Sequence, residues 1–286
     1  MISLTEYNYN KLEMGLYIVS TPIGNLSDIS LRALNIFKNS DYIFCEDTRV
    51  SKNLLDKYNI KTKLISNHKF NEKSNLTKIN KMLEQNKIIS IISDAGTPCV
   101  SDPGQIIVNE CIKKSIKIFS VPGASAVTAA MSASGFDQKF FFYGFFPEKK
   151  KRKSKLLQQT YLELDVLLFF LSLQKNLKKK TSIIKKYFAD RSIVICKEMT
   201  KIYEDYVRFE VPEIENIELK LKGEITIVLS PTISKNLSNL TDLDKKKIKK
   251  LIESSSIKDI VKIINKNKKI QKKEIYDFCL SLKNEK

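Results

Sequence analysis

A loop rich in aspartate, glycine and proline is the part of this chain best suited to ligand chemistry. The segment SDAGTPCVSDPG, residues 93–104, follows an apolar run at 87–92 that predicts a buried strand. Its residue types bend the backbone and expose amide groups to a ligand. Asp102 followed by Pro103 is also a helix start signal, with Asp as the N-cap. Taken alone, a ligand loop and an ordinary strand-to-helix connection are equally good interpretations.

Two further loops have the same character. The segment 20–34 follows a strand candidate, forms a tight turn around Pro22 and Gly24, and offers Ser27 as a helix cap. The segment 121–135 is rich in small residues, which allow a ligand or another backbone to approach closely. Three such loops after three strands predict ligand-facing backbones at the carboxyl edge of one sheet, where open α/β sheets bind ligands.

The elements that carry these loops alternate between strands and helices. This alternation predicts a parallel, doubly wound sheet, followed by a second α/β domain with a smaller mixed sheet and a short helical tail. The expected parts are an N-terminal extension (1–14), an N-terminal α/β domain (15–121), a second α/β domain (122–230), a linker (231–241) and a helical C-terminal module (242–286). A plain pair of charged helices is an equally good interpretation of the tail.

Expected strands and helices have definite bounds. In the first domain we expect strands at 15–20, 41–45, 62–66, 87–92 and 116–121, with helices near 28–38, 48–58, 72–85, 104–114 and 124–134. In the second we expect strands at 139–143, 166–171, 192–197, 205–210 and 223–229, with helices at 152–162 and 175–189.

Positive charge is concentrated in the second half of the chain. The net charge is +18, of which residues 1–148 contribute +3 and residues 149–286 contribute +15. Lysine runs at 149–155, 178–180 and 245–250 carry much of the excess and suit nucleic-acid phosphates. Simple solvation is the alternative, because lysine outnumbers arginine by 45 to 5 and part of the excess reflects composition. The balanced first half favours RNA contact.

Cysteine usage and hydropathy predict a cytoplasmic globular protein. The 42% hydrophobic content is ordinary for such proteins. Five cysteines without CxxC spacing predict reduced thiols and no metal site. Cys99, within the 93–104 loop, is interpreted as a tolerated small residue and not a nucleophile. No apolar run approaches the roughly 18 residues that span a membrane, and no targeting segment is visible.

A series of motifs gives the chain a family resemblance. The motifs are TPIGNL (21–26), CEDTR (45–49), SDAGTP with SDPG (93–104), VPGASA (121–126), FYGFFP (142–147), KEMTKIYEDYVR (197–208) and GEITIVL (223–229). In order and spacing they resemble the tetrapyrrole methylase superfamily over residues 15–230. More specifically, they are similar to its bacterial branch that methylates a cytidine ribose in small-subunit ribosomal RNA.

The resemblance implies S-adenosylmethionine held between the two α/β domains. The cofactor-binding residues that it implies are Pro22, Gly24, Asp94, Ala95, Gly96, Thr97, Ser125 and Ala126. A carboxylate such as Asp94 suits a sulfonium cation, although capping its own turn is the alternative. Neither GxGxxG nor GxxxxGK[ST] occurs, so a nicotinamide or triphosphate site has little support.

Methyl transfer to a ribose hydroxyl needs positioning and a proton acceptor. His68 is the only histidine and is as good a structural loop residue as a functional one. Glu46, Asp47 and Arg49 in CEDTR are better placed, since a carboxylate can take the proton and Arg49 can hold a phosphate. A salt bridge among them is an alternative of nearly equal weight.

One motif of the branch is altered. Where it carries an FYESPHR-like strand end, this chain has FFLSLQK at 169–175, which keeps Phe169, Ser172 and a basic end. The contribution of this loop to substrate binding and activity therefore stays open. The RNA-binding residues expected are Lys149, Lys150, Lys151, Arg152, Lys153 and Lys175.

The family resemblance also implies a homodimer acting on small-subunit ribosomal RNA, naked or assembled. Two other functions are weighed against it. A tetrapyrrole C-methyltransferase would favour a less basic second half. A non-catalytic RNA-binding or assembly factor is kept open by the altered 169–175 loop, and the retained cofactor loops count against it.

Overall fold

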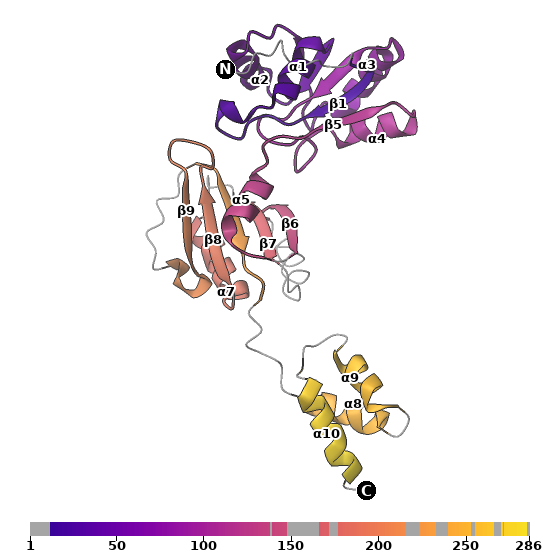
Figure 1. Ribbon diagram of the computed structural model, residues 1–286, viewed down its shortest axis with the longest axis vertical. Helices are drawn as coiled ribbons and strands as arrows, with labels where there is room; N and C mark the ends of the chain where they lie inside the picture. The colour runs from indigo at the N-terminus through magenta and orange to yellow at the C-terminus, as the bar shows by residue number, and fades with distance from the viewer. Residues whose placement is uncertain are drawn as a thin grey trace. The chain divides into compact units, whose positions relative to one another are not determined.

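The chain divides into two compact units, Met1–Thr232 and Ile233–Lys286. A computed structural model, drawn in Figure 1, describes residues 12–137, 139–147, 166–171, 177–215, 223–232, 240–252, 255–265, 270 and 272–284. The predicted helix at 152–162, the lysine run at 149–155 and most of the predicted linker lie outside the described residues. The expected boundary between the two α/β domains, after residue 121, stays a prediction.

The first sheet is parallel, as predicted. Its five strands lie in the order β3-β2-β4-β1-β5. They are β1 (Gly15–Val19), β2 (Tyr42–Cys45), β3 (Lys63–Ser66), β4 (Ile88–Ile91) and β5 (Ile118–Val121). The central strands are buried on both faces, because β-branched and aromatic residues occupy successive positions.

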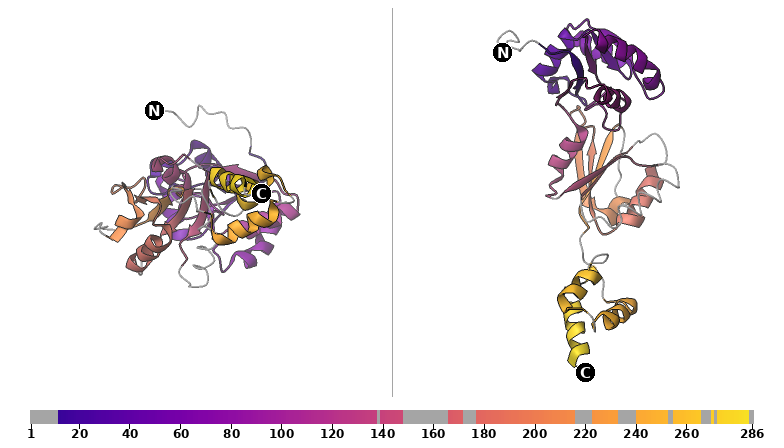
Figure 2. Two further views of the ribbon diagram at one scale, coloured as in Figure 1. Left: turned by 90° about the horizontal axis from the view of Figure 1, so that it is seen from below. Right: turned by 90° about the vertical axis from the view of Figure 1, so that its right-hand side faces the viewer.

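Helices cover both faces of this sheet (Figure 2). They are α1 (Leu31–Asn39), α2 (Thr48–Lys57), α3 (Glu72–Glu84) and α4 (Gln105–Lys113). Tyr17 and Ile43 pack with α1 and α2, whereas the alternate residues Leu16 and Phe44 pack with α3 and α4. This alternation confirms the doubly wound prediction.

The start of α1 differs from the expectation. Ser27 was predicted to cap the helix, but it lies inside the short 3-10 turn η2 (Leu26–Asp28). Asn25 caps that turn, since its side chain accepts from Ser27 N at 3.0 Å. Ser30 caps α1 by accepting from Ala33 N at 3.1 Å. The prediction was wrong because each of three polar residues in the segment can cap a turn, and the extra turn moves the helix start.

The second sheet is mixed, as predicted, and it equals the first in strand number instead of being smaller. Its order is β6-β7-β10-β8-β9, with only the β6–β7 pair parallel. The strands are β6 (Phe140–Phe145), β7 (Val166–Leu171), β8 (Ser192–Lys197), β9 (Asp205–Glu210) and β10 (Ile225–Leu229).

Two layers cover the second sheet (Figure 1). On one face α5 (Ala126–Ser134) packs Val127 and Ala130 against Leu168 and Val228. The opposite face carries α7 (Leu177–Phe188) and the 3-10 turn η3 (Val211–Glu215). The apolar strands fix both layers, because alternate residues along β7 and β10 face opposite cores.

The second unit is a three-helix cluster in the described residues. Its helices are α8 (Asp242–Leu251), α9 (Ile257–Asn265) and α10 (Lys272–Asn284), which pack on buried apolar residues that include Ile248, Ile260 and Ile275. A capping box between Thr241 and Asp244 starts α8. The described part of the chain contains no helix of the length and apolarity that crossing a membrane requires.

Candidate active site

Loops from the carboxyl ends of β1, β4 and β5 meet at one edge of the first sheet. Thr21 and Gly96 exchange backbone hydrogen bonds, with N···O distances of 2.9 and 3.1 Å. The hydroxyls of Ser20 and Thr97 lie 3.1 Å apart, and Thr97 Oγ1 donates to Ala124 O at 3.4 Å. The three ligand loops that the sequence predicts are therefore brought together.

This meeting point coincides with the switch in chain direction across the sheet. The loop after β1 leads to α1 on one face, and the loop after β4 leads to α4 on the other. Because β1 and β4 are neighbours, the two connections diverge from adjacent strands. Open α/β sheets bind ligands at such positions.

Small residues let these loops approach closely. A Cβ atom at Gly123 would lie 2.9 Å from Ser20 Cβ, a distance that real Cβ contacts do not reach. Gly123 and Ala95 are exposed, and Ser125 and Ala126 are half-buried at the start of α5. The backbone is thus accessible where the three loops meet, as a site for an extended ligand requires.

Gly24 lies in a different setting from the other loop residues. Pro22 is buried, whereas Gly24 is exposed and packs against Thr200 and Lys201 in the connection between β8 and β9. Apart from the buried Pro22, the residues predicted to bind one cofactor thus form two groups. Asp94, Ala95, Gly96, Thr97, Ser125 and Ala126 belong to the converging loops, and Gly24 borders the second sheet.

The CEDTR motif supplies both a helix cap and an ion pair. Asp47 Oδ1 accepts from Arg49 N at 2.8 Å, which caps α2, and Asp47 Oδ2 lies 2.6 Å from Arg49 Nη2. Hydrogen bonds from Arg49 lower the pKa of Asp47 to about 2. The salt bridge weighed from the sequence is present, so the Asp47 carboxylate is already engaged.

Asp94 connects the loop after β4 to the loop after β2. Its Oδ1 accepts from Asp47 N at 3.0 Å, so it holds the neighbouring loop and does not cap its own turn. The pKa of Asp94 is raised, first because surrounding atoms displace part of its solvent and then because Asp47 is close. Its carboxylate therefore lies among other negative groups.

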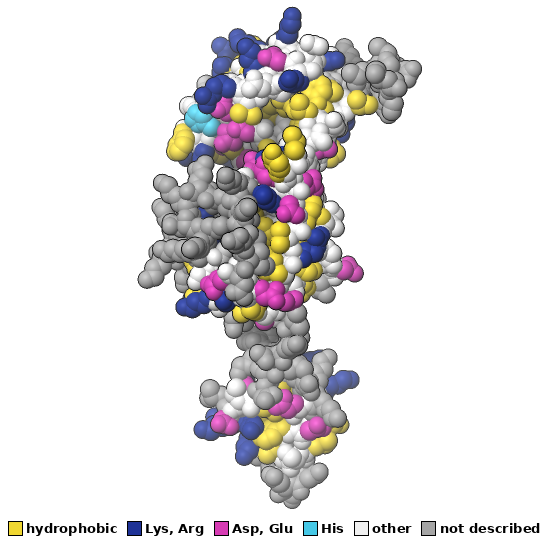
Figure 3. Space-filling model, turned by 90° about the vertical axis from the view of Figure 1, so that its left-hand side faces the viewer, with side chains coloured by type: hydrophobic (Ala, Val, Ile, Leu, Met, Phe, Trp, Pro, Cys, Tyr) yellow, Lys and Arg dark blue, Asp and Glu magenta, His cyan; other side chains and the backbone are white. Residues whose placement is uncertain are grey.

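Glu46 and Asp102 share this negative environment. Partial burial raises the pKa of Glu46, the Asp94 charge raises it further, and His68 opposes the rise. Burial, together with the charges of Glu46 and Asp94, raises the pKa of Asp102 to about 6. Figure 3 shows the single histidine beside a group of acidic side chains on the surface of this domain. A cationic ligand would be favoured at such a place.

Asp102 does not cap α4, which corrects the sequence prediction. The helix begins at Gln105 with Gly104 as its N-cap residue. Glu72 of α3 performs the capping, because its Oε1 accepts from Gly104 N at 3.0 Å and Ile106 N at 2.9 Å. The Asp102 carboxyl therefore does not cap the helix. Sequence reasoning missed it as a site residue because the Asp-Pro pair has a simpler local explanation.

Cys99 agrees with its interpretation as a small residue without nucleophilic function. Burial raises the pKa of its thiol to about 11, so the reactive thiolate is scarce at neutral pH. Its φ of 67° lies in the left-handed region that favours glycine. Among the residues that the structure describes, no cluster of His, Cys, Asp or Glu side chains is arranged to hold a metal ion.

These features define a class of protein: two successive α/β domains with ligand loops at the carboxyl edge of the first sheet. A family model described as Tetrapyrrole (Corrin/Porphyrin) Methylases matches residues 15–215. The chain therefore belongs to the tetrapyrrole methylase family.

Curated relatives identify the branch. The chain is 43% identical over 218 residues to ribosomal RNA small subunit methyltransferase I of Thermotoga maritima, a match covering 75% of this chain and 97% of that relative. It is 34% identical over 277 residues to the Bacillus subtilis protein of the same name. This match covers 93% of this chain and 94% of that relative. The predicted resemblance to the small-subunit ribosomal RNA branch is therefore confirmed at the level of these names.

Solved structures show the same fold at low identity. Diphthine synthase superposes with a TM-score of 0.59 at 15% identity, covering 75% of this chain and 89% of the other. Uroporphyrin-III-C-methyltransferase from Thermus thermophilus superposes with a TM-score of 0.54 at 14% identity, covering 77% and 95%. These likenesses support the architecture alone.

Proposed function

We propose that this chain is an S-adenosylmethionine-dependent methyltransferase that modifies the 2′-hydroxyl of a cytidine in small-subunit ribosomal RNA. The observation that supports it most is the convergence of the three loops at β1, β4 and β5 in a chain whose relatives carry the name ribosomal RNA small subunit methyltransferase I. The choice of cytidine as the nucleotide and of the ribose 2′-oxygen as the methyl acceptor rests on the motif resemblance.

The converging loops fit this cofactor chemically. Glu46, Asp94 and Asp102 place negative charge where the sulfonium cation would be stabilised. When bound, the cofactor supplies an activated methyl group. The exposed backbone at Ala95 and Gly123 leaves room for the remainder of an extended molecule. The eight cofactor-binding residues expected from the motifs stay proposals.

A carboxylate from these loops would take the proton of the ribose hydroxyl. Asp47 is engaged by Arg49, so of the CEDTR carboxylates Glu46 is the better acceptor. Asp102 is a second acceptor, because a pKa of about 6 leaves it mostly ionised at pH 7 yet basic enough to hold a proton. Arg49 is exposed and remains the proposed phosphate contact.

The lysine-rich segments would bind RNA phosphates. Lys149, Lys150, Lys151, Arg152, Lys153 and Lys175 lie outside the described residues, and their RNA contact stays a prediction. On α8, Lys246, Lys247, Lys249 and Lys250 are exposed. The match to the Thermotoga relative covers 97% of that protein and 75% of this chain, so that relative is shorter than this chain. We therefore infer that the helical unit adds affinity for RNA and takes no part in the chemistry.

Homodimer formation and a cytoplasmic location complete the proposal. A two-fold dimer would present two basic surfaces to one large RNA. Sedimentation as a dimer at micromolar concentration supports this part of the proposal, and a monomer across that range contradicts it.

The decisive experiment maps ribose methylation by mass spectrometry in small-subunit ribosomal RNA from cells with and without this protein. We expect one 2′-O-methylcytidine to disappear. An RNA with 2′-deoxycytidine at the mapped position should bind nearly as well but accept no methyl group. Methylation of the deoxy substrate would show that a base atom is the acceptor. Failure of the purified protein to bind S-adenosylmethionine would favour a non-catalytic RNA-binding factor.

A further inference from the structure

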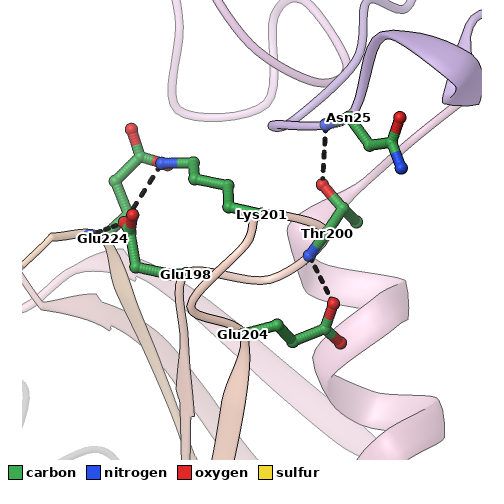
Figure 4. A network of polar contacts seen from close by, with 6 residues as sticks. All are labelled: Asn25, Glu198, Thr200, Lys201, Glu204 and Glu224. Carbon is green, nitrogen blue, oxygen red and sulfur yellow. Dashed lines mark hydrogen bonds and ion pairs between the residues drawn. The ribbon is translucent and has the colours of Figure 1, made fainter.

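The connection between β8 and β9, residues 198–204, reaches from the second sheet to the loop after β1. Figure 4 shows this contact, in which Asn25 N donates to Thr200 Oγ1 at 3.0 Å. Gly24 lies against the same connection. A Cβ atom there would be 2.5 Å from Lys201 Cγ and 2.8 Å from Thr200 Oγ1. The absence of a side chain at Gly24 is therefore a condition for the contact.

Hydrogen bonds and ion pairs hold the 198–204 connection in this arrangement. Glu198 Oε1 accepts from Glu224 N at 2.7 Å and from Lys201 Nζ at 3.1 Å, and Lys201 also pairs with Glu224 at 3.2 Å (Figure 4). Glu204 accepts from Thr200 N at 2.8 Å. These bonds tie the Glu198 end of the connection to Glu224 and join Glu204 to the Thr200 amide, so they support the backbone that carries the Thr200 hydroxyl.

Thr200 adopts a backbone conformation that is costly for its residue type. Its φ is 67°, in the left-handed region, where a β-branched residue is a genuine outlier. Glu198 has a φ of 48° in the same connection. Such conformations persist only where surrounding contacts enforce them, and they concentrate at sites with a function. Here the enforced conformation aims a hydroxyl at Asn25.

The loop that Thr200 holds is also joined to the converging loops. Asn25 lies four residues after Thr21, and Thr21 is tied by two backbone bonds to Gly96. The loop after β1 is thus bonded at one end to the loop after β4 and at the other to the second sheet.

We propose that Thr200 is a positioning residue, through which the second sheet fixes the loop after β1 and thereby sets the affinity for the cofactor. This inference rests on the proposed function for the cofactor only, because the loop contact itself can be measured without any ligand. The hydroxyl acts as a hydrogen-bond acceptor and touches no reacting atom.

Amide hydrogen exchange of Asn25, followed by nuclear magnetic resonance on the full chain without ligand, tests the contact. Thr200→Val keeps the shape of the side chain and removes the acceptor, and Thr200→Ser keeps the acceptor. We expect Asn25 exchange to accelerate about fivefold or more in Thr200→Val, the equivalent of one ordinary hydrogen bond, and to stay unchanged in Thr200→Ser. Unchanged exchange in Thr200→Val would overturn the proposal.

Gly24→Ala gives an independent route to the same contact. Its methyl group should displace Thr200 and raise Asn25 exchange as Thr200→Val does. The two changes together should have no larger effect than either alone, because both break one contact. Independent, additive effects would contradict the inference.

Cofactor affinity tests the consequence. Calorimetry should give about fivefold weaker S-adenosylmethionine binding for Thr200→Val and full rescue by Thr200→Ser, with KM for the cofactor raised and kcat kept. Thr62→Val is the matched control. It removes the Thr62 bond to Phe37 O at the start of β3, and it should lower the melting temperature without changing cofactor affinity.

The two proposals fail in distinguishable ways. No cofactor binding by the unaltered protein refutes the proposed function, and Asn25 exchange still decides the contact. An unchanged affinity in Thr200→Val, with Asn25 exchange accelerated, refutes the positioning role and leaves the proposed function standing.

Discussion

The carboxyl edge of the first sheet and helix α8 hold charged residues in opposite ways. At the sheet edge, Asp94 binds Asp47 across 47 residues of sequence, and Glu72 binds the start of α4. On α8, by contrast, the exposed lysines are placed by the local helix alone. Each charged side chain at the sheet edge thus has its own hydrogen-bond partner, whereas α8 carries several similar exposed lysines. We expect single substitutions to have large, distinct effects in the first region and small, similar effects in the second.

The largest effect is expected at Glu72. The Glu72 residue is 5% exposed, and its carboxylate accepts from the amides of Gly104 and Ile106. Glu72→Ala leaves those amides without their partner, and we expect a loss of about 3 kcal/mol in the free energy of unfolding. Urea titration measures it. Glu84→Ala, on the exposed side of the same helix, removes only an ion pair with Lys114 and should cost less than about 0.5 kcal/mol. Equal losses would break the comparison.

Asp94 should come next, through cofactor binding. Asp94→Ala removes both the negative charge and the acceptor for Asp47 N, so binding of S-adenosylmethionine should weaken by about 1–3 kcal/mol. Asp94→Asn keeps an acceptor oxygen and removes the charge. Calorimetry of the two variants separates the causes: a loss in both assigns the effect to charge, and a loss in Asp94→Ala alone assigns it to the loop contact.

Asp102 should give a smaller effect that depends on pH. Its pKa of about 6 lies above the usual value of 3.8, because burial and neighbouring charges disfavour the ionised form. The folded protein therefore holds the proton more tightly, and stability falls as the pH rises from about 4 to about 6. Asp102→Asn should remove much of this fall and raise the free energy of unfolding at pH 7 by about 1–2 kcal/mol.

Asp47→Asn provides the control of opposite sign. The pKa of Asp47 is lowered to about 2, so its stabilising charge is present above the usual pKa and is lost only as the pH falls through about 2. We expect the free energy of unfolding, measured by urea titration between pH 4 and 7, to depend on pH in Asp47→Asn as it does in the unaltered protein. A changed pH dependence in Asp47→Asn, with an unchanged one in Asp102→Asn, would contradict the pKa shifts assigned to these two residues.

The smallest single effects are expected on α8. Lys246→Glu, Lys247→Glu and Lys250→Glu should each weaken RNA binding by similar amounts of less than about 1 kcal/mol, and each should reduce the salt dependence by about one phosphate contact. Filter binding across a salt series measures both. The exposed residues Lys73, Lys78 and Lys81 of α3 are the controls, and their reversal should leave RNA binding unchanged. A much larger loss of RNA binding in one of these variants than in the others would contradict the expected difference between α8 and the sheet edge.

The sequence predicted most of the fold because its signals are local. The runs at 166–171, 192–197 and 205–210 match β7, β8 and β9 in both bounds, since each is a short run that contains β-branched or aromatic residues. Strand order was beyond the same reasoning, because pairing of β1 with β4 depends on contacts across the whole domain. The family came from motif order, which short loops preserve.

The site was predictable only in part for the same reason. Loops 93–104 and 121–126 were found from their small and turn-forming residues, and they do converge. The capping role of Glu72 has no local signal, because its partners lie 32 or more residues away. Thr200 was equally hidden, since its contact with Asn25 spans 175 residues and joins elements of different sheets.

The sheet orders also bear on the sequence of events during synthesis. In the second sheet, β10 lies between β7 and β8 and hydrogen-bonds to both. The strand made last is therefore the central one, and β7 and β8 have no shared partner until the ribosome has passed residue 229. Only the β6–β7 and β8–β9 pairs can form earlier, as two separate ribbons with exposed apolar edges. In the first sheet the joining strand is β4, which lies between β2 and β1 and is made by residue 91, and the last strand, β5, is made by residue 121. The nascent chain should hence acquire its two sheets at well-separated times, with the intermediate most prone to aggregation while β10 is still inside the exit tunnel.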